Sequence, residues 1–138
     1  MNQKTPIFHP LTEMPMIAEV IDGMLQDSKE QLETLEPCRD KPHVLDDDTV
    51  DRVTKLYTER AEFIGVYQQQ LTRWRKQNPS ATQKLEIARL YKTVREMKEL
   101  NDYILNLAAE LKQGTIDRIM EKDDVELALE VLSGKMKL

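Results

Sequence analysis

The residues able to hold a metal ion or attack a substrate lie in one stretch of the chain. Cys38, His43 and the acidic run 46–48 follow one another closely. Zinc sites usually need four ligands in paired spacings such as C-x-x-C and H-x-x-x-H, and neither spacing occurs here. A Cys–His pair can serve as nucleophile and base, but the sequence offers no third group to support the base. We therefore expect a loop histidine and aspartates that cap a helix, with no metal and no catalytic residue.

Other motifs of common active sites are also absent from the sequence. The only histidines, His9 and His43, lie outside the predicted helices, and no Glu-x-x-His occurs, which excludes a di-metal carboxylate centre. There is no Gly-rich phosphate loop, no G-x-S-x-G and no dinucleotide fingerprint. The sequence therefore predicts a protein that is not an enzyme and that has no cofactor.

A basic cluster, Arg73-Trp74-Arg75-Lys76, is the most distinctive surface feature, and Lys84 and Arg89 follow it. Basic side chains beside an exposed Trp suit phosphate contact with base stacking, so a nucleic-acid-associated regulator is the alternative function. However, Trp74 falls on an apolar seam, which predicts that it is buried. We expect the cluster to be a solvated tip or to match the acidic charge of the first helix. The net charge of −5 also argues mildly against a polyanion as the main partner.

Composition sets the fold class. The 138 residues include 33% charged residues but only 4 Gly and 6 Pro, which is typical of long solvated helices, and alternating strand-like runs are absent. A single cysteine suits a reducing cytoplasm. The chain start leads into no signal-like apolar region, and no apolar stretch is long enough to span a membrane. We predict an all-α cytoplasmic protein with an extended arm over 1–12 and one helical domain over 13–138.

Three long helices are predicted, over 13–35, 48–77 and 80–113. Capping residues support their starts: Thr12 for the first, one of Asp46, Asp47 and Asp48 for the second, and a Ser80–Gln83 capping box for the third. Gly114 is placed to end the third helix in the left-handed conformation. The apolar stripe of the first helix is Met16, Ile17, Val20, Ile21, Met24, Leu25, Leu32 and Leu35.

The second and third helices carry matching apolar seams in steps of three and four, as in a coiled coil. A tight turn at Asn78-Pro79 must fold them into an antiparallel hairpin, which the first helix covers as the third member of a bundle. This register predicts that Tyr67 contacts Leu90, Ile64 contacts Val94, and Val53 contacts Ile104. Asn101, the only polar seam residue of the third helix, then lies level with Tyr57 and one turn from Arg60. A lone seam Asn usually fixes register, and a buried polar recognition site is the alternative.

The tail is predicted to form two short helices, over 116–121 and 124–133, which fold back on the end of the hairpin. The second carries Val125, Leu129 and Leu132, and we expect these leucines to be buried there. This helix and the Ile7-Phe8 arm are the pieces that can lift away to leave a groove for a partner helix.

Lack of catalytic groups, together with amphipathic terminal pieces, favours a protein-binding module such as an adaptor, small chaperone or regulator. Its partner is another protein, and a homodimer is a further option because a long two-helix seam often pairs with its own copy. In layout, residues 48–134 are similar to the small bacterial flagellar and type III export chaperones. The resemblance is one of architecture, and it implies an antiparallel hairpin with mobile terminal helices.

Overall fold

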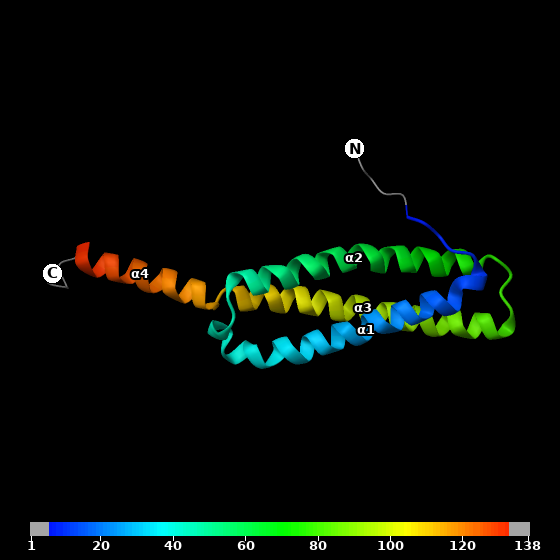
Figure 1. Cartoon of the computed structure of the whole chain (residues 1–138), viewed down its shortest axis with the longest axis horizontal. Helices are drawn as coiled ribbons and strands as arrows, with labels where there is room; N and C mark the ends of the chain where they lie inside the picture. Colours follow the sequence, from blue (N-terminus) through cyan, green and yellow to red (C-terminus); the bar gives the residue numbers. More distant parts are fainter. Residues whose placement is uncertain (1–5, 133–138) are drawn as a thin grey trace.

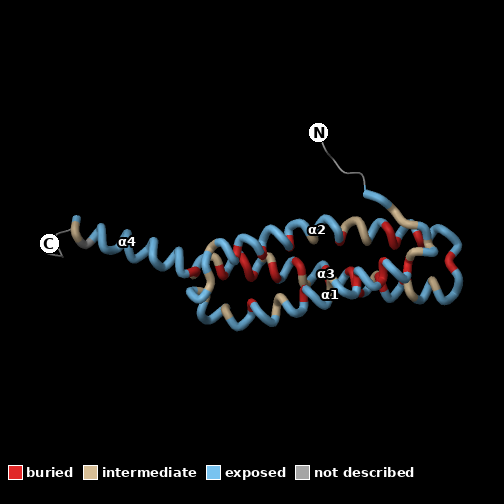
Figure 2. Tube along the Cα trace, in the orientation of Figure 1, coloured by how far each residue is buried: buried red, intermediate tan, exposed pale blue. Residues whose placement is uncertain are grey.

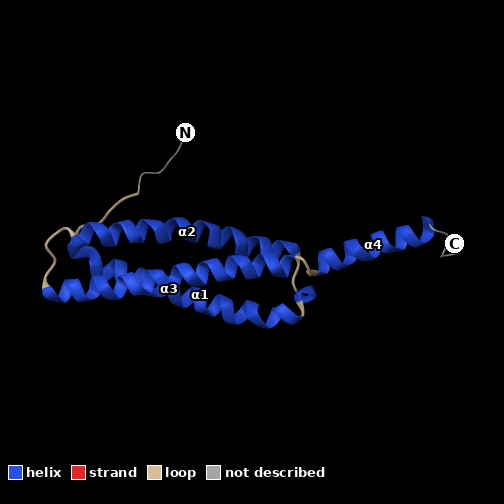
Figure 3. Cartoon of the chain, turned by 180° about the vertical axis from the view of Figure 1, so that it is seen from behind, coloured by secondary structure: helices blue, strands red, loops and turns tan. Residues whose placement is uncertain are grey.

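The computed structural model describes residues 6–132, and every regular element within them is a helix, which confirms the all-α fold class (Figure 1; Figure 3). The long helices are α1 (Met14–Leu35), α2 (Asp47–Arg75), α3 (Ala81–Lys112) and α4 (Ile116–Leu132). Three short 3-10 turns are η1 (Leu11–Glu13), η2 (Glu36–Asp40) and η3 (Pro42–Val44). None of the helices in this part of the chain is both long and apolar enough to cross a membrane.

A tight turn joins α2 to α3 as predicted. Asn78 adopts a left-handed φ of 55°, which Asn tolerates better than most residues. Ser80 then begins α3 with the predicted capping box: its Oγ accepts from Gln83 N at 3.1 Å, and Gln83 Oε1 accepts from Ser80 N at 2.8 Å. At the start of α2, Asp46 Oδ1 accepts from Thr49 N at 2.8 Å. Hydrogen bonds between residues close in sequence therefore fix where α2 and α3 begin.

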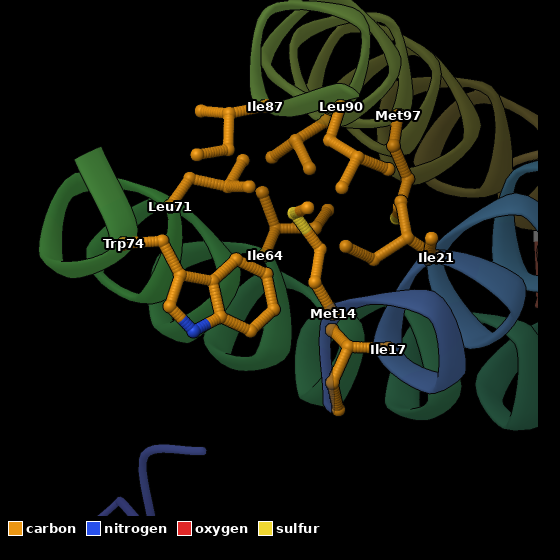
Figure 4. Close-up of a cluster of buried hydrophobic side chains, with 11 residues drawn as sticks. Met14, Ile17, Ile21, Ile64, Leu71, Trp74, Ile87, Leu90 and Met97 are labelled. Atoms are coloured by element: carbon orange, nitrogen blue, oxygen red, sulfur yellow. The ribbon is translucent and has the colours of Figure 1, made fainter. Parts of the chain in front are cut away.

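The core runs along the bundle as two buried clusters (Figure 2). The cluster nearer the α2–α3 turn holds Trp74, Ile64 and Val94, with Tyr67 packed against it, and Figure 4 shows side chains from α1, α2 and α3 pointing toward one another there. The second cluster holds Val53 and Ile104. The predicted register thus places the expected partners in the same clusters.

α1 packs along α3 more closely than along α2. Its predicted stripe is only partly correct, because Met16 and Val20 are exposed while Met14 and Ala18 are buried. The predicted cap also differs: Thr12 lies in η1, and α1 begins at Met14 with no side-chain cap. An apolar stripe wider than its contact surface leaves one edge in solvent.

The predicted tail is wrong in two respects. α4 is one continuous helix, and it extends away from the bundle (Figure 1). Leu129 and Leu132 are therefore exposed, at 59% and 84%, where burial was predicted. The predicted end of the second tail helix, at residue 133, lies outside the described residues.

Gly114 lies beyond the end of α3 at Lys112 and does not adopt the predicted left-handed conformation. A Cβ added to it would lie 2.5 Å from Pro42 Cγ. Next to this contact, Ile116 N donates to the Leu45 carbonyl oxygen at 2.9 Å. A missing side chain thus lets η3 approach the α3–α4 junction closely.

Candidate functional site

The basic cluster at the α2–α3 turn does not present its tryptophan. Trp74 is 0% exposed, and its Nε1 donates to the His9 carbonyl oxygen at 2.9 Å. The expected burial of Trp74 is thus confirmed, and base stacking on its ring is excluded because the ring has no free face. Arg73, Arg75 and Lys76 remain exposed around it.

These contacts fasten the N-terminal arm to the turn. The buried Gln70 accepts from His9 N at 2.7 Å and donates to the His9 carbonyl oxygen at 3.3 Å. The Arg73 guanidinium lies over the Phe8 ring, 3.9 Å from its centroid. Sequence reasoning missed Gln70, because the run 68–70 is all Gln and no signal selects one of them.

Most cations of this tip have no carboxylate partner in the described chain. Within the described chain, Arg73, Arg75, Lys76 and Lys84 form no ion pair. Arg89, by contrast, donates to both carboxylate oxygens of Asp22, at 2.9 and 3.0 Å. The predicted charge match with acidic α1 is therefore made by Arg89 alone among the tip cations.

Arg89 shows the electrostatic effect of that pairing. Its hydrogen bonds to Glu86 and Asp22 raise the pKa of its guanidinium above the ordinary value, so the group stays charged. Arg75 has no ion pair within the described chain, and its guanidinium carbon lies 5.9 Å from the centroid of the Tyr91 ring. The unpaired tip cations are available to an outside anion.

Several shallow hollows lie at or near the tip, and two of them, one beside Arg75 and one beside the arm, are mainly apolar. One, of about 260 Å³, has an apolar floor of Ile87, Ala88 and Tyr91 between Arg75 and Lys84. The other, of about 360 Å³, lies beside the arm between α1 and α2, and its lining includes Ile7, Ile17, Phe63 and Tyr67. Each is large enough for one or two side chains of a partner, and neither encloses a small molecule as a deep pocket does.

The buried polar position lies where the register predicted. Asn101 is 1% exposed, and its Nδ2 donates to the Tyr57 carbonyl oxygen at 3.0 Å, while its Oδ1 has no hydrogen-bond partner. Arg60 lies over the Tyr57 ring and donates to the Met24 carbonyl oxygen and to Ser28 Oγ, at 3.2 and 3.1 Å. Burial raises the pKa of the Tyr57 phenol. This cluster ties the three helices together and has no opening to solvent at Asn101.

Only the first turn of α4 is tied to the bundle. Asp117 Oδ2 accepts from Asp47 N at 2.7 Å, Thr115 Oγ1 donates to Asp47 Oδ1 at 2.7 Å, and Arg118 lies 3.6 Å from Asp47. Within the described chain, no hydrogen bond or ion pair joins residues 120–132 to the bundle. The helix beyond its first turn therefore stands in solvent.

Apolar side chains occupy two different faces of α4. Val125, Leu129 and Leu132, in steps of four and three, form a distal face. Met120 and Leu127, seven apart and 60% and 48% exposed, form a second face on roughly the opposite side. The apolar positions of the two predicted short helices thus lie on different faces of one continuous helix.

The loop residues with metal-binding chemistry do not converge. Cys38 is half-buried, with its Sγ 3.7 Å from the Thr34 carbonyl oxygen, and His43 is exposed. Among residues 6–132, no three His, Cys, Asp or Glu side chains gather where they could hold a metal ion.

Comparison with known proteins found no match among protein-family models, curated proteins or solved structures.

Proposed function

We propose that this chain works by binding another protein, and that the distal face of α4 is the binding element. The observation that carries the proposal is the exposure of Val125, Leu129 and Leu132, at 54%, 59% and 84%, on a helix that projects from a packed bundle. Residues four and three apart lie on one side of a helix, which is the pattern of an amphipathic helix that binds in a groove.

On its own, α4 lacks the tertiary packing that stabilises most helices in proteins. At 17 residues, α4 is close to the length at which isolated helices are marginal in water, because most helical stability comes from packing an apolar face. Fully burying one leucine side chain contributes about 1.5 to 3 kcal/mol. A partner that covers the distal face therefore gains several apolar contacts and also stabilises the helix.

A cytoplasmic location belongs to the same proposal, since the single cysteine makes no internal disulfide and suits a reducing compartment. No nucleophile–base–support set in the described residues favours catalysis, because Cys38 and His43 are not brought together with a third group. The nucleic-acid alternative loses its stacking residue, since Trp74 is buried.

A pull-down with matched variants tests the proposal. The wild-type chain, Val125→Ser/Leu129→Ser/Leu132→Ser and a control, Met16→Ser/Val20→Ser, are used as baits in native cell extract. Both variants replace exposed apolar residues, so all three baits are expected to fold alike by circular dichroism. We expect the partner to be lost only from the α4 variant. Capture of the same proteins by all three baits, or of none by the wild type, contradicts the proposal.

A further inference from the structure

Opposite charges accumulate at the two ends of this molecule. Residues 73–85, at the α2–α3 turn, contain the four bases Arg73, Arg75, Lys76 and Lys84 and no acid. Residues 116–132, which form α4, contain six acids and two bases, a net charge of −4. Unpaired surface charges of opposite sign attract over roughly 10 Å at moderate salt. The two ends are therefore complementary.

The charged ends of one chain cannot meet each other. The turn and α4 lie at opposite ends of the bundle (Figure 1). α2 has 29 residues and is about 43 Å long, whereas α4 has 17 residues and is about 25 Å long. Even folded back along the bundle, α4 reaches little more than half its length. Only another molecule can bring an acidic helix to the basic tip.

The basic tip also contains an apolar hollow. The hollow of about 260 Å³ between Arg75 and Lys84 has Ile87 and Tyr91 in its floor. Its size suits one or two protruding apolar side chains, and its rim is basic. A phosphate backbone would use the rim but has no apolar group for the floor, so an acidic helix with apolar residues fits the whole surface better.

α4 carries the matching surface on its second face. Met120 and Leu127 lie two turns apart, with Asp123 between them and Asp124 beside them, all exposed. An apolar pair flanked by carboxylates is the counterpart of an apolar floor flanked by cations. The distal face, by comparison, has Arg118 and Lys122 among its neighbours and suits the tip less well.

We propose that α4 of one copy binds the basic tip of a second copy, with Met120 and Leu127 over the Ile87–Tyr91 floor and the α4 carboxylates against Arg75 and Lys84. This inference rests on the proposed role of α4 as the binding element and assigns its second face to a copy of this chain. The distal face stays free for the other protein.

Such an interface joins two different surfaces, so it is heterologous. Each copy in a pair then keeps one free surface, and further copies can add unless the rotation between neighbouring copies closes the assembly into a ring. The contact area is small, which places it among weak interfaces with a Kd of about 1 to 100 μM. Ion pairs at its rim make it sensitive to salt. We expect association that grows with concentration, continues past the dimer and weakens by tenfold or more between 50 and 500 mM salt.

Sedimentation velocity on the full chain, from about 5 to 500 μM, tests this assembly. The tip variant is Arg75→Glu/Lys84→Glu, and the tail variant is Asp123→Lys/Asp124→Lys. All four side chains are exposed, so both variants are expected to keep the wild-type circular dichroism spectrum and Tm. We expect each variant alone to associate at least tenfold more weakly than the wild type.

Mixing the two variants gives the decisive result. The tip variant retains an intact α4 and the tail variant retains an intact tip, so a mixture can form this contact. The reversed charges, glutamates on one variant and lysines on the other, also attract each other, so the mixture should associate more tightly than either variant alone. A control, Lys55→Glu/Lys92→Glu, makes the same change in charge at exposed positions outside both surfaces and should associate like the wild type. Failure of the mixture to pair, or a wild-type chain that stays monomeric at 500 μM, overturns the proposal.

Two further outcomes separate this inference from its rivals. Val125→Ser/Leu129→Ser/Leu132→Ser should still self-associate, because it leaves the second face intact, so partner binding and self-association can fail independently. In parallel, labelled single- and double-stranded nucleic acids are titrated with the wild-type chain and with the tip variant. Micromolar binding of nucleic acid that is lost in the tip variant, with a monomeric wild type, would assign the tip to a polyanion and refute self-association.

Discussion

Replacing Gly114 by alanine tests whether the α3–α4 junction packs against η3 as the structure shows. An added Cβ would lie 2.5 Å from Pro42 Cγ and 3.2 Å from Pro42 Cβ. Ordinary van der Waals contacts are about 3.4 to 4 Å, so the methyl group overlaps a rigid ring by nearly 1 Å. Either η3 or the junction must therefore move.

The size of the effect follows from that overlap. Forcing an extra methyl group into a packed site usually costs 1 to 3 kcal/mol. We expect Gly114→Ala to lower the free energy of unfolding by about 2 kcal/mol, or roughly 6 to 10 °C in Tm for a domain of this length. Because Gly114 is not left-handed, none of this cost arises from backbone strain.

Two other glycines supply the control. Gly23 lies within α1 and Gly65 within α2, and a Cβ at either would meet nothing within 4 Å. Alanine is the better helix former, so each substitution should stabilise the chain by about 0.5 to 1 kcal/mol. Urea unfolding of the three variants gives the comparison. A Gly114→Ala variant as stable as Gly23→Ala would show that η3 does not approach the junction.

Three further predictions concern the seam, a helix cap and α4. Asn101→Leu removes a buried acceptor without a partner and should raise stability by about 1 kcal/mol in urea unfolding; a loss of that size would show that the hydrogen bond to Tyr57 outweighs it. The hydrogen bond from Thr49 lowers the pKa of the capping Asp46 carboxyl, so the cap stabilises the fold while ionised. The deficit of Asp46→Ala should therefore be full above about pH 5 and shrink as the pH falls below the ordinary value of 3.8, as thermal melts at several pH values can show. Leu129→Ala should change stability by less than about 0.5 kcal/mol, whereas Leu107→Ala in the core should cost about 3 kcal/mol.

The hairpin could be predicted from sequence because its determinants are local or periodic. The capping box fixes where α3 starts, and Asn78 supplies the left-handed residue of the turn. Once the turn is placed, antiparallel geometry sets the register, so Asn101 meets Tyr57 without further information. The position of Trp74 on the apolar seam of α2 likewise predicts its burial.

The tail and the arm could not be predicted in the same way. Whether the apolar residues of α4 fold back or project depends on the junction, where Gly114, Pro42 and Leu45 make long-range contacts that no periodic pattern reports. The arm is held by Gln70, one of three consecutive glutamines, and its role depends on the carbonyl group of His9. Contacts of this kind join residues far apart in sequence through backbone atoms, which every residue carries.

The placement of apolar residues on α4 argues against a resting position on its own bundle. A helix packed on one surface buries one face, but Met120 and Leu127 lie roughly opposite Val125, Leu129 and Leu132. Folding back would therefore cover one set and leave the other in solvent, while it would also bring a helix of net charge −4 toward the acidic outer face of α1. A position between two other surfaces covers both sets. In our proposals, one of those surfaces is the basic tip of a second copy, with its shallow apolar hollow, and the other is a surface of a different protein.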